Sequence, residues 1–475
     1  MTTHPAAEAI SHPAARPAGR RPWLALSVLA LAQFMLVLDV TVVNVALPDI
    51  GAGLHLSGPS LTWVLTAYTV VFGGLMLLGG RLADLFGARR LALAGLALFT
   101  AASLASGLAA SAPMLIGGRV AQGAGAALLS PAALALVTTM FSGRDRHRAL
   151  GVWAAIGGAG SAIGVVLGGL LTSAAGWPWV FFINVPTGAA VLIAIPLLVP
   201  ASRPQAAGAR LDVPGALLVT AATAAAIFGL VSVGSHGWAA PAVLVPLALA
   251  ATGYAAFALA ERRAAVPLMD LRLLARRPVA AGSFLMLAAT GLLVGSFFLG
   301  SFSLQRGHGY SALATGLLFL PVALAIVAGA HAASHAVTRL DRRVLTAAAL
   351  AVAAAGSALA ASVPGAAGLV TGMSVAALGL GATFVLATTT ALAATTGHTA
   401  GLGSGIVSTS HELGGAAGVA VLSSIALAGA GPGLSGAGFT RAFTVSAVAA
   451  LVTAALAALT VPRGPAAAAA GPHAH

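Results

Sequence analysis

Two charged side chains stand inside long apolar stretches of this chain. Asp39 lies in the run Leu29–Pro48, which holds no other charge, and Arg119 lies in the run Ile116–Pro131. A carboxyl group in apolar surroundings binds or releases a proton near neutrality as those surroundings change, whereas a guanidinium group stays charged. The two groups could therefore carry a proton, with Arg119 tuning Asp39 by approach and withdrawal. A purely structural ion pair is the alternative interpretation.

Further polar side chains lie in the same stretches and in one later stretch. At 100° per residue, Thr41 and Asn44 lie close on one face of a helix, and Asp39 points elsewhere. This pattern suits a helix that lines a cavity, although hydrogen bonds to neighbouring helices would also explain it. Glu412 is the other acid expected near or within a span, at mid-depth or at the cytoplasmic mouth, with a role in coupling or substrate binding. The candidate cavity residues are Gln33, Thr41, Asn44, Gln122 and His411.

Other site chemistries find no support in the sequence. There is no cysteine, which excludes disulfides and thiolate catalysis, and no Ser/His/Asp set or phosphate-binding loop that would indicate an enzyme or an ATP-driven pump. No His/Asp/Glu cluster has metal-ligand spacing, so we expect no metal and no cofactor. His331 and His335 could titrate, but an interfacial position explains them as well.

The composition indicates the elements that position these groups. Hydrophobic residues make up 59% of the 475 residues and charged residues only 7%, too few to cover a soluble surface. Because about 20 apolar residues cross a bilayer as a helix, the chain is predicted to be an all-α polytopic membrane protein. The expected spans are fourteen: 23–47, 60–80, 91–110, 113–138, 149–173, 179–199, 213–233, 241–260, 279–304, 312–336, 344–362, 365–392, 403–428 and 438–461.

The positive charges alternate between the connecting loops. The net charge is +13, all 23 basic residues are arginine, and all but Arg119, Arg306 and Arg441 fall in alternate loops or in the tails. The positive-inside rule places those loops and both termini in the cytoplasm. Scattered short clusters of this kind are ordinary loop charges and do not indicate nucleic-acid binding.

The longest charged connections follow the sixth and eighth spans and bracket a pair of helices with almost no polar residues. This predicts two six-helix bundles plus two inserted helices, an internal duplication that is typical of transporters. The expected division is a disordered cytoplasmic tail at 1–22, an N-terminal bundle at 23–200, two inserted spans with flanking loops at 201–278, a C-terminal bundle at 279–462 and a cytoplasmic tail at 463–475.

The segment GRLADLFGARR follows the second span. Gly80 and Gly87 permit a tight cytoplasmic turn, Asp84 can pair with an arginine or cap a helix, and Arg89 and Arg90 close the segment. A solvated run of loop charges is one interpretation of this segment.

A second glycine pattern lies in the fifth span. Gly160, Gly164 and Gly168 recur every four residues, and Gly169 follows. Small residues at this spacing let helix backbones approach closely. No strand precedes them and no G-x-G-x-x-G is completed, so they are not a dinucleotide site.

These segments together resemble the fourteen-span drug:proton antiporters of the major facilitator superfamily. The similarity is carried by LDVTVVNVALP, TWVLTAYTVVFGG, GRLADLFGARR, the Arg119–Gln122–Gly123–Gly125 segment and STSHELGGAAGVAVL, which has His411 at a usual Arg position. The antiporter motif G-P-x-x-G-G is matched at Gly164, Gly168 and Gly169, but Val165 replaces its proline.

The resemblance implies the major facilitator fold and a proton-coupled exporter of amphipathic drugs or antibiotics that works by alternating access. Asp39, Arg119 and Glu412 would couple the proton, and the proton gradient would supply the energy. The resemblance also implies that the segment with Gly80, Asp84, Gly87, Arg89 and Arg90 is a cytoplasmic gate. The implied setting is the bacterial inner (cell) membrane, with a monomer in the lipid bilayer and no nucleic-acid partner. A narrow exporter of one metabolite is the alternative, and a passive facilitator or a membrane-embedded enzyme is a more distant one. With few acids in the cavity, neutral or singly charged substrates are expected over dications.

Overall fold

The computed structural model describes residues 20–56, 58–141, 143–201, 212–263, 271–393, 400–427 and 436–464, and these are helical apart from short connections. The first half contains α1 (Arg20–Gly53), α2 (Gly58–Phe86), α3 (Ala88–Gly107), α4 (Ala112–Met140), α5 (Gly143–Ala175), α6 (Trp179–Phe182) and α7 (Asn184–Leu198). The rest contains α8 (Val213–His236), α9 (Pro241–Arg263), α10 (Leu271–Leu274), α11 (Arg277–Phe302), η1 (Ser303–Gly307), α12 (Ala312–Ala336), α13 (Arg342–Ser362), α14 (Gly365–Leu392), α15 (Ala400–Leu427) and α16 (Gly436–Thr460).

Length and composition make the chain a multi-pass membrane protein. Among the described residues, ten helices are long and apolar enough to cross a membrane, and shorter apolar stretches lie in α2, α5 and α8. Each expected span overlaps one long helical segment, with α6 and α7 together forming the sixth. The expectation of an all-helical polytopic protein is confirmed.

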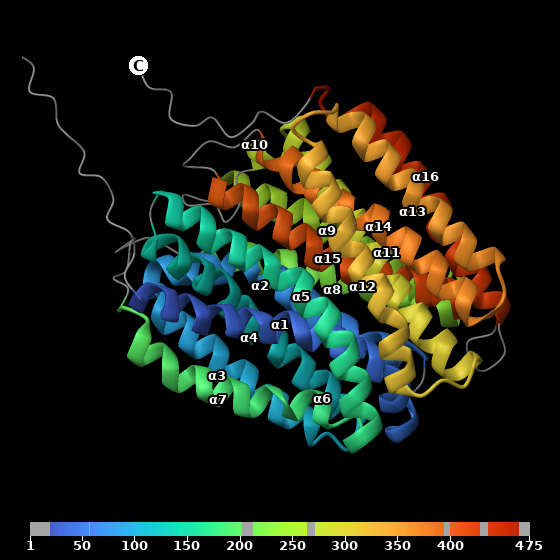
Figure 1. The fold of residues 1–475 in the computed structure, drawn as a ribbon, viewed down its shortest axis with the longest axis horizontal. Coiled ribbons are helices and arrows are strands. Elements are labelled where there is room, and N and C mark those ends of the chain that lie inside the picture. Colours follow the sequence, from blue (N-terminus) through green and yellow to red (C-terminus); the bar gives the residue numbers. More distant parts are fainter. Residues whose placement is uncertain are drawn as a thin grey trace, which may run out of the picture.

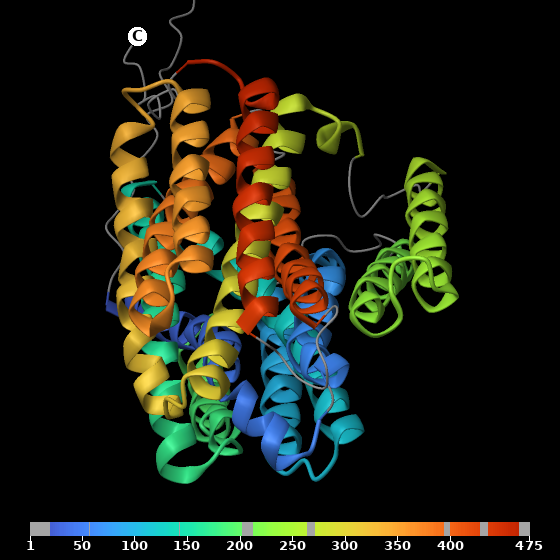
Figure 2. The same ribbon diagram turned by 90° about the vertical axis from the view of Figure 1, so that its right-hand side faces the viewer.

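The helices pack in two groups (Figure 1). Within the first group α3 packs on α4 and α7, α4 on α2, and α1 on α5; within the second, α13 packs on α14 and α16, α12 on α14, and α11 on α15. The helices α8 and α9 pack on each other, and α8 also contacts α2 and α15, so the pair lies at one side of the molecule (Figure 2).

The two groups are joined at one end of the molecule. Gln305 donates to the Val45 carbonyl oxygen at 2.7 Å and Arg306 to the Pro48 carbonyl oxygen at 3.0 Å, so the π-helical segment η1 is bonded to the last turns of α1. The start of α12 also lies directly on the end of α5, where a Cβ added at Gly316 would be 2.4 Å from the Val165 carbonyl oxygen.

The same contact recurs in both groups at the opposite ends of the helices. At the start of α3, Arg89 donates to the Pro196 carbonyl oxygen of α7 at 2.8 Å. At the start of α13, Arg343 donates to the Val461 carbonyl oxygen just after α16 at 3.0 Å. In each case an arginine at one helix start satisfies a carbonyl group that a helix end leaves without an intrahelical partner.

The segment expected to form the turn after the second span is mostly helical. α2 continues to Phe86, so Gly80 and Asp84 belong to its last turns, and only Gly87, with a φ of 91°, makes the turn into α3. The prediction that the loop begins at residue 80 is therefore wrong. The polar residues in GRLADLF are compatible with a helix that extends beyond its apolar part. The side chain of Asp84 lies outside what the structure describes.

Candidate functional site

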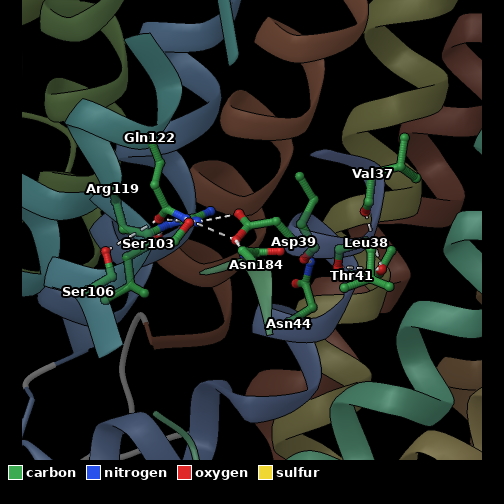
Figure 3. A network of polar contacts seen from close by, with 12 residues as sticks. Val37, Leu38, Asp39, Thr41, Asn44, Ser103, Ser106, Arg119, Gln122 and Asn184 are labelled. Carbon is green, nitrogen blue, oxygen red and sulfur yellow. Dashed lines mark hydrogen bonds and ion pairs between the residues drawn. The ribbon is translucent and has the colours of Figure 1, made fainter. Parts of the chain in front are cut away.

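Asp39 and Arg119 form a buried ion pair between α1 and α4. The Asp39 side chain is 0% exposed and the Arg119 side chain 1% exposed, and Nη1 of Arg119 lies 2.5 Å from Oδ2 of Asp39 (Figure 3). Removing one partner of a buried pair leaves an uncompensated charge and costs about 3–5 kcal/mol. The free energy of each buried side chain therefore depends on whether the other one is charged.

Two amide side chains complete the contacts of the carboxylate. Its other oxygen, Oδ1, accepts hydrogen bonds from Asn184 Nδ2 of α7 at 3.0 Å and from Gln122 Nε2 of α4 at 3.1 Å. Gln122 is itself held by Ser103 Oγ of α3 at 2.8 Å. Three donor groups therefore converge on one buried carboxylate.

Neutral groups surround the guanidinium of Arg119. Its Nε donates to the Val64 carbonyl oxygen of α2 at 3.0 Å, and Nη1 also donates to Gln122 Oε1 at 2.9 Å. The Tyr68 ring centroid lies 4.5 Å from Cζ and the Phe181 ring centroid 5.9 Å, both within the range of a cation–π contact.

Glycines of α4 bring this helix close to α2 and α3. A Cβ at Gly125 would lie 2.6 Å from the Phe99 nitrogen of α3, and a Cβ at Gly123 would lie 2.5 Å from the Tyr68 carbonyl oxygen of α2. Both distances are too short for a real side chain, so α4 sits directly on the backbones of α2 and α3. This approach lets Arg119 and Gln122 reach across to α1.

The remaining polar residues of α1 have different surroundings. Thr41 bonds to the Val37 and Leu38 carbonyl oxygens of its own helix and lies against Gly164 of α5. Asn44 donates to the Val40 carbonyl oxygen at 2.9 Å, but its Oδ1 is buried without a hydrogen-bond partner, as is Oε1 of Gln33. Unpaired buried acceptors are costly, and these two oxygens have no hydrogen-bond partner among the described residues.

Glu412 and His411 lie outside the Asp39–Arg119 network. His411 Nδ1 is 3.3 Å from Glu412 Oε1, and the two side chains are 47% and 15% exposed. A Cβ at Gly73 would lie 2.8 Å from Glu412 Cβ. Gly73 and Glu412 are both near the middle of their helices, so Glu412 stands at mid-helix on the boundary between α2 and α15.

The glycines of α5 face two helices. Gly160, Gly164 and Gly168 lie against Val37, Thr41 and Val42 of α1, whereas Gly169 lies against Ala312 and Leu313 of α12. The expected close-packing stripe thus serves both the first helix group and its contact with the second.

Three residues of the site were not identified from the sequence: Ser103, Asn184 and Tyr68. Tyr68 stands in a segment whose resemblance was noted as a whole, and Asn184 is the lone polar residue in the apolar run FFINVP. An isolated amide in an apolar run is a usable signal, because such a group seeks a buried partner. For the part of the chain that the structure describes, no group of three or more His, Cys, Asp or Glu residues could hold a metal ion.

The fold and the buried ion pair define a polytopic membrane transporter with two packed helix groups. A sequence model described as Major Facilitator Superfamily matches residues 29–419, and the chain belongs to that superfamily. It is accordingly a secondary transporter and not an enzyme.

The chain is similar in sequence to several resistance and export proteins. The chain is 38% identical over 342 residues to puromycin resistance protein pur8 of Streptomyces alboniger, covering 71% of this chain and 67% of the relative. It is also 38% identical to cephamycin export protein CmcT of Amycolatopsis lactamdurans (70% and 69% covered) and 34% identical to multidrug resistance protein Stp of Mycobacterium tuberculosis (68% and 60% covered).

Solved structures share the fold at low identity. A bacterial homologue of the human lysosomal transporter Spinster, in an inward-facing and occupied conformation, superposes with a TM-score of 0.68 at 16% identity, covering 94% of this chain and 98% of that one. The human organic anion transporter MFSD10 gives a TM-score of 0.60 at 14% identity, covering 92% and 99%. These similarities support the architecture alone.

Proposed function

We propose that this chain exports amphipathic antibiotics or drugs in exchange for protons. The observation that carries the proposal is the Asp39–Arg119 ion pair, buried in a chain whose relatives are named for resistance to, or export of, puromycin, cephamycin and multiple drugs. An ionisable pair inside a membrane is costly and is retained where it moves charge.

Coupling follows from the contacts of Asp39. In the present arrangement the Asp39 carboxylate accepts hydrogen bonds from three donor groups, which suits a carboxylate that carries no proton. A proton that binds to Asp39 removes its charge and so its attraction to Arg119. The hydrogen bonds from the amide groups of Gln122 and Asn184 to Asp39 then become weaker. The loss of these contacts would loosen α1 from α4 and α7 and favour a different packing of the bundle. Proton binding and helix movement would in this way be one event.

The proposed topology has fourteen spans, with both termini in the cytoplasm of a bacterial cell and the chain a monomer in the cell membrane. Residues 23–200 and 279–462 form the two bundles and 201–278 hold the inserted pair. On this orientation the joined end, where η1 bonds to α1, is extracytoplasmic, which makes this the conformation that accepts substrate from inside. The cavity residues would include Gln33 and Asn44, whose buried oxygens lack partners.

Transport into inverted membrane vesicles tests the proposal. Acidifying the vesicle interior should drive uptake of labelled puromycin by the wild type, and Asp39→Asn should abolish this dependence on the gradient. Asp145→Asn, which removes the 3.5 Å contact with the exposed Arg148 outside the Asp39 network, is the matched control. Gradient-driven uptake that is unchanged in the Asp39 variant would exclude this residue from coupling.

A narrow exporter of one compound is the second candidate, because two of the relatives are named for a single antibiotic. The two cases are distinguished by measuring whether lincomycin, a cationic dye or a dicationic dye inhibits the uptake of puromycin. Competition by several unrelated compounds supports the broad exporter, and competition by none supports the narrow one.

A further inference from the structure

Tyr68 is the aromatic residue nearest to the charged pair, and the coupling scheme above gives it no role. Its side chain is fully buried, and its ring centroid lies 4.5 Å from Cζ of Arg119. The backbone of Tyr68 is fixed against α4, since a Cβ at Gly123 would touch its carbonyl oxygen. The ring therefore covers the guanidinium as a rigid part of the α2–α4 contact.

Proton uptake creates a difficulty that the ion pair alone does not solve. When Asp39 carries the proton, Arg119 becomes a cation with 1% exposure and no counter-charge beside it. A buried, uncompensated charge of this kind is strongly unfavourable. The partners that remain are neutral: the Val64 carbonyl oxygen, Gln122 Oε1 and the two aromatic rings. The Tyr68 ring is the nearer of the two rings.

We propose that Tyr68 is a positioning residue of the coupling site, whose ring holds Arg119 beside Asp39 while the carboxyl group carries the proton. The proposal rests on the proton-coupled function argued above. The electron-rich face of the ring attracts the guanidinium whether Asp39 is charged or neutral, but only in the neutral state does it replace a lost counter-charge. The ring would thus lower the cost of the protonated state and keep Arg119 ready to pair again.

The surroundings of Tyr68 assign this role to the ring and not to the hydroxyl group. The buried hydroxyl oxygen has no hydrogen-bond partner among the described residues. The charged groups that act on it are Asp39 of α1, Arg119 of α4 and Glu412 of α15. A substitution that keeps the ring and removes the hydroxyl should therefore preserve coupling, while one that removes the ring should not.

The test compares the pH dependence of puromycin binding and of gradient-driven uptake in purified, reconstituted protein. Tyr68→Phe should match the wild type. Tyr68→Leu should shift the pH midpoint down by about half to one unit and slow uptake, because the protonated state loses its neutral partner. Phe99→Leu, at a fully buried aromatic residue of α3 outside the network, is the control for lost packing and should leave the midpoint unchanged.

Each outcome decides between explanations. An unshifted Tyr68→Leu midpoint, or an equal shift in Tyr68→Phe and Tyr68→Leu, would overturn the role of the ring, the second result by pointing to the hydroxyl group. If Tyr68→Leu does not fold, Tyr68→Trp, which keeps an aromatic face, must still behave as the wild type does. Asp39→Asn is measured in the same experiment. A wild-type pH profile in that variant would contradict the proposed role of Asp39 in coupling. A failure of the proposed function can thus be distinguished from a failure of the Tyr68 proposal.

Discussion

At the scale of single residues, the site consists of one carboxylate and the side chains that donate hydrogen bonds to it. Asp39 receives hydrogen bonds from Arg119, Gln122 and Asn184, which come from two different helices. A buried ion pair contributes little net stability because desolvation offsets the Coulomb attraction. The value of these contacts lies instead in their dependence on protonation, since each donor favours the ionised carboxylate over the neutral acid.

Replacing Asn184 by alanine should move proton-driven transport to higher pH. Its amide donates a hydrogen bond to Asp39 Oδ1 at 3.0 Å, and a hydrogen bond to a charged group contributes about 1.5–3 kcal/mol. The pH profile of uptake in proteoliposomes measures the shift. Thr187→Ala is the matched control on the same helix, because the Thr187 hydroxyl donates to the Ile183 carbonyl oxygen at the start of α7 itself at 3.0 Å. A profile that moves equally in both variants would contradict the assignment of Asn184 to the site.

Helix elements hold the site through backbone contact, and α4 shows this clearly. Its glycines differ sharply in surroundings: Gly125 lies on the backbone of α3, while nothing is within 4 Å of the space that a Cβ at Gly117 would occupy. Gly125 is therefore needed for the close contact between α4 and α3, whereas Gly117 takes no part in such a contact.

Gly125→Ala should destabilise the protein by about 1–3 kcal/mol, since the added methyl group forces α3 and α4 apart. Gly117→Ala should cause no loss, because its methyl group points into open space. Thermal unfolding of the two variants in detergent gives the comparison. Equal melting temperatures would mean that α3 and α4 are not packed as closely as described.

A second element-level device joins the start of α13 to the segment after α16. Asp341 accepts hydrogen bonds from the backbone N–H groups of Gly464, Val344 and Arg343, and Gly464 contributes most to holding the pKa of this carboxyl group below its ordinary value. A lowered pKa in the folded state means that the unfolded state binds the proton more readily. The stabilisation is then complete above the ordinary pKa of an aspartate and is lost as the pH falls through the lowered value.

Asp341→Asn should lower the melting temperature at neutral pH, and the difference from the wild type should shrink as the buffer is acidified below the ordinary pKa of an aspartate. Asparagine keeps the ability to cap α13, so the loss reports mainly the contact with Gly464. Melting curves over a pH series measure it, with Asp145→Asn as a surface control. A difference that grows in acid would reverse the sign argued here.

At the scale of the whole molecule, the contacts between the two helix groups set the conformation. The joined end is held by η1 on α1 and by α12 on α5, and a further link lies where Thr62 of α2 donates to Ser423 of α15 at 3.2 Å between the two hydroxyl oxygens. Alternating access requires contacts of this kind to break and form again during each cycle.

A disulfide across this boundary should stop transport. The chain has no native cysteine, so Thr62→Cys combined with Ser423→Cys gives a single possible bridge, between two side chains that are each 1% exposed. Oxidation should abolish uptake and reduction should restore it, while each single variant stays active under both conditions. Full uptake by the cross-linked protein would show that α2 and α15 do not separate at this level.

Much of the architecture follows from local properties of the sequence. The apolar runs and arginine clusters locate nearly every helix, because burial in lipid and the cost of charge act on each segment separately. They also single out Asp39 and Arg119, since a charge in such a run is conspicuous wherever the helix lies. Gly80 was misassigned to a loop because helix ends in polar sequence carry a weaker signal than apolar cores.

The sequence by itself singled out the two charged residues Asp39 and Arg119, and tertiary structure alone decided which side chains meet around them. That Asn184 and Ser103 join Asp39, that Thr41 faces α5, and that Glu412 stands apart at the α2–α15 boundary all depend on neighbouring helices. Every helix in lipid is already satisfied in its own backbone hydrogen bonds, so its hydropathy does not specify a neighbour. The neighbours are chosen by the fit of glycines and polar side chains across long sequence distances, and this fit exists only in the folded bundle.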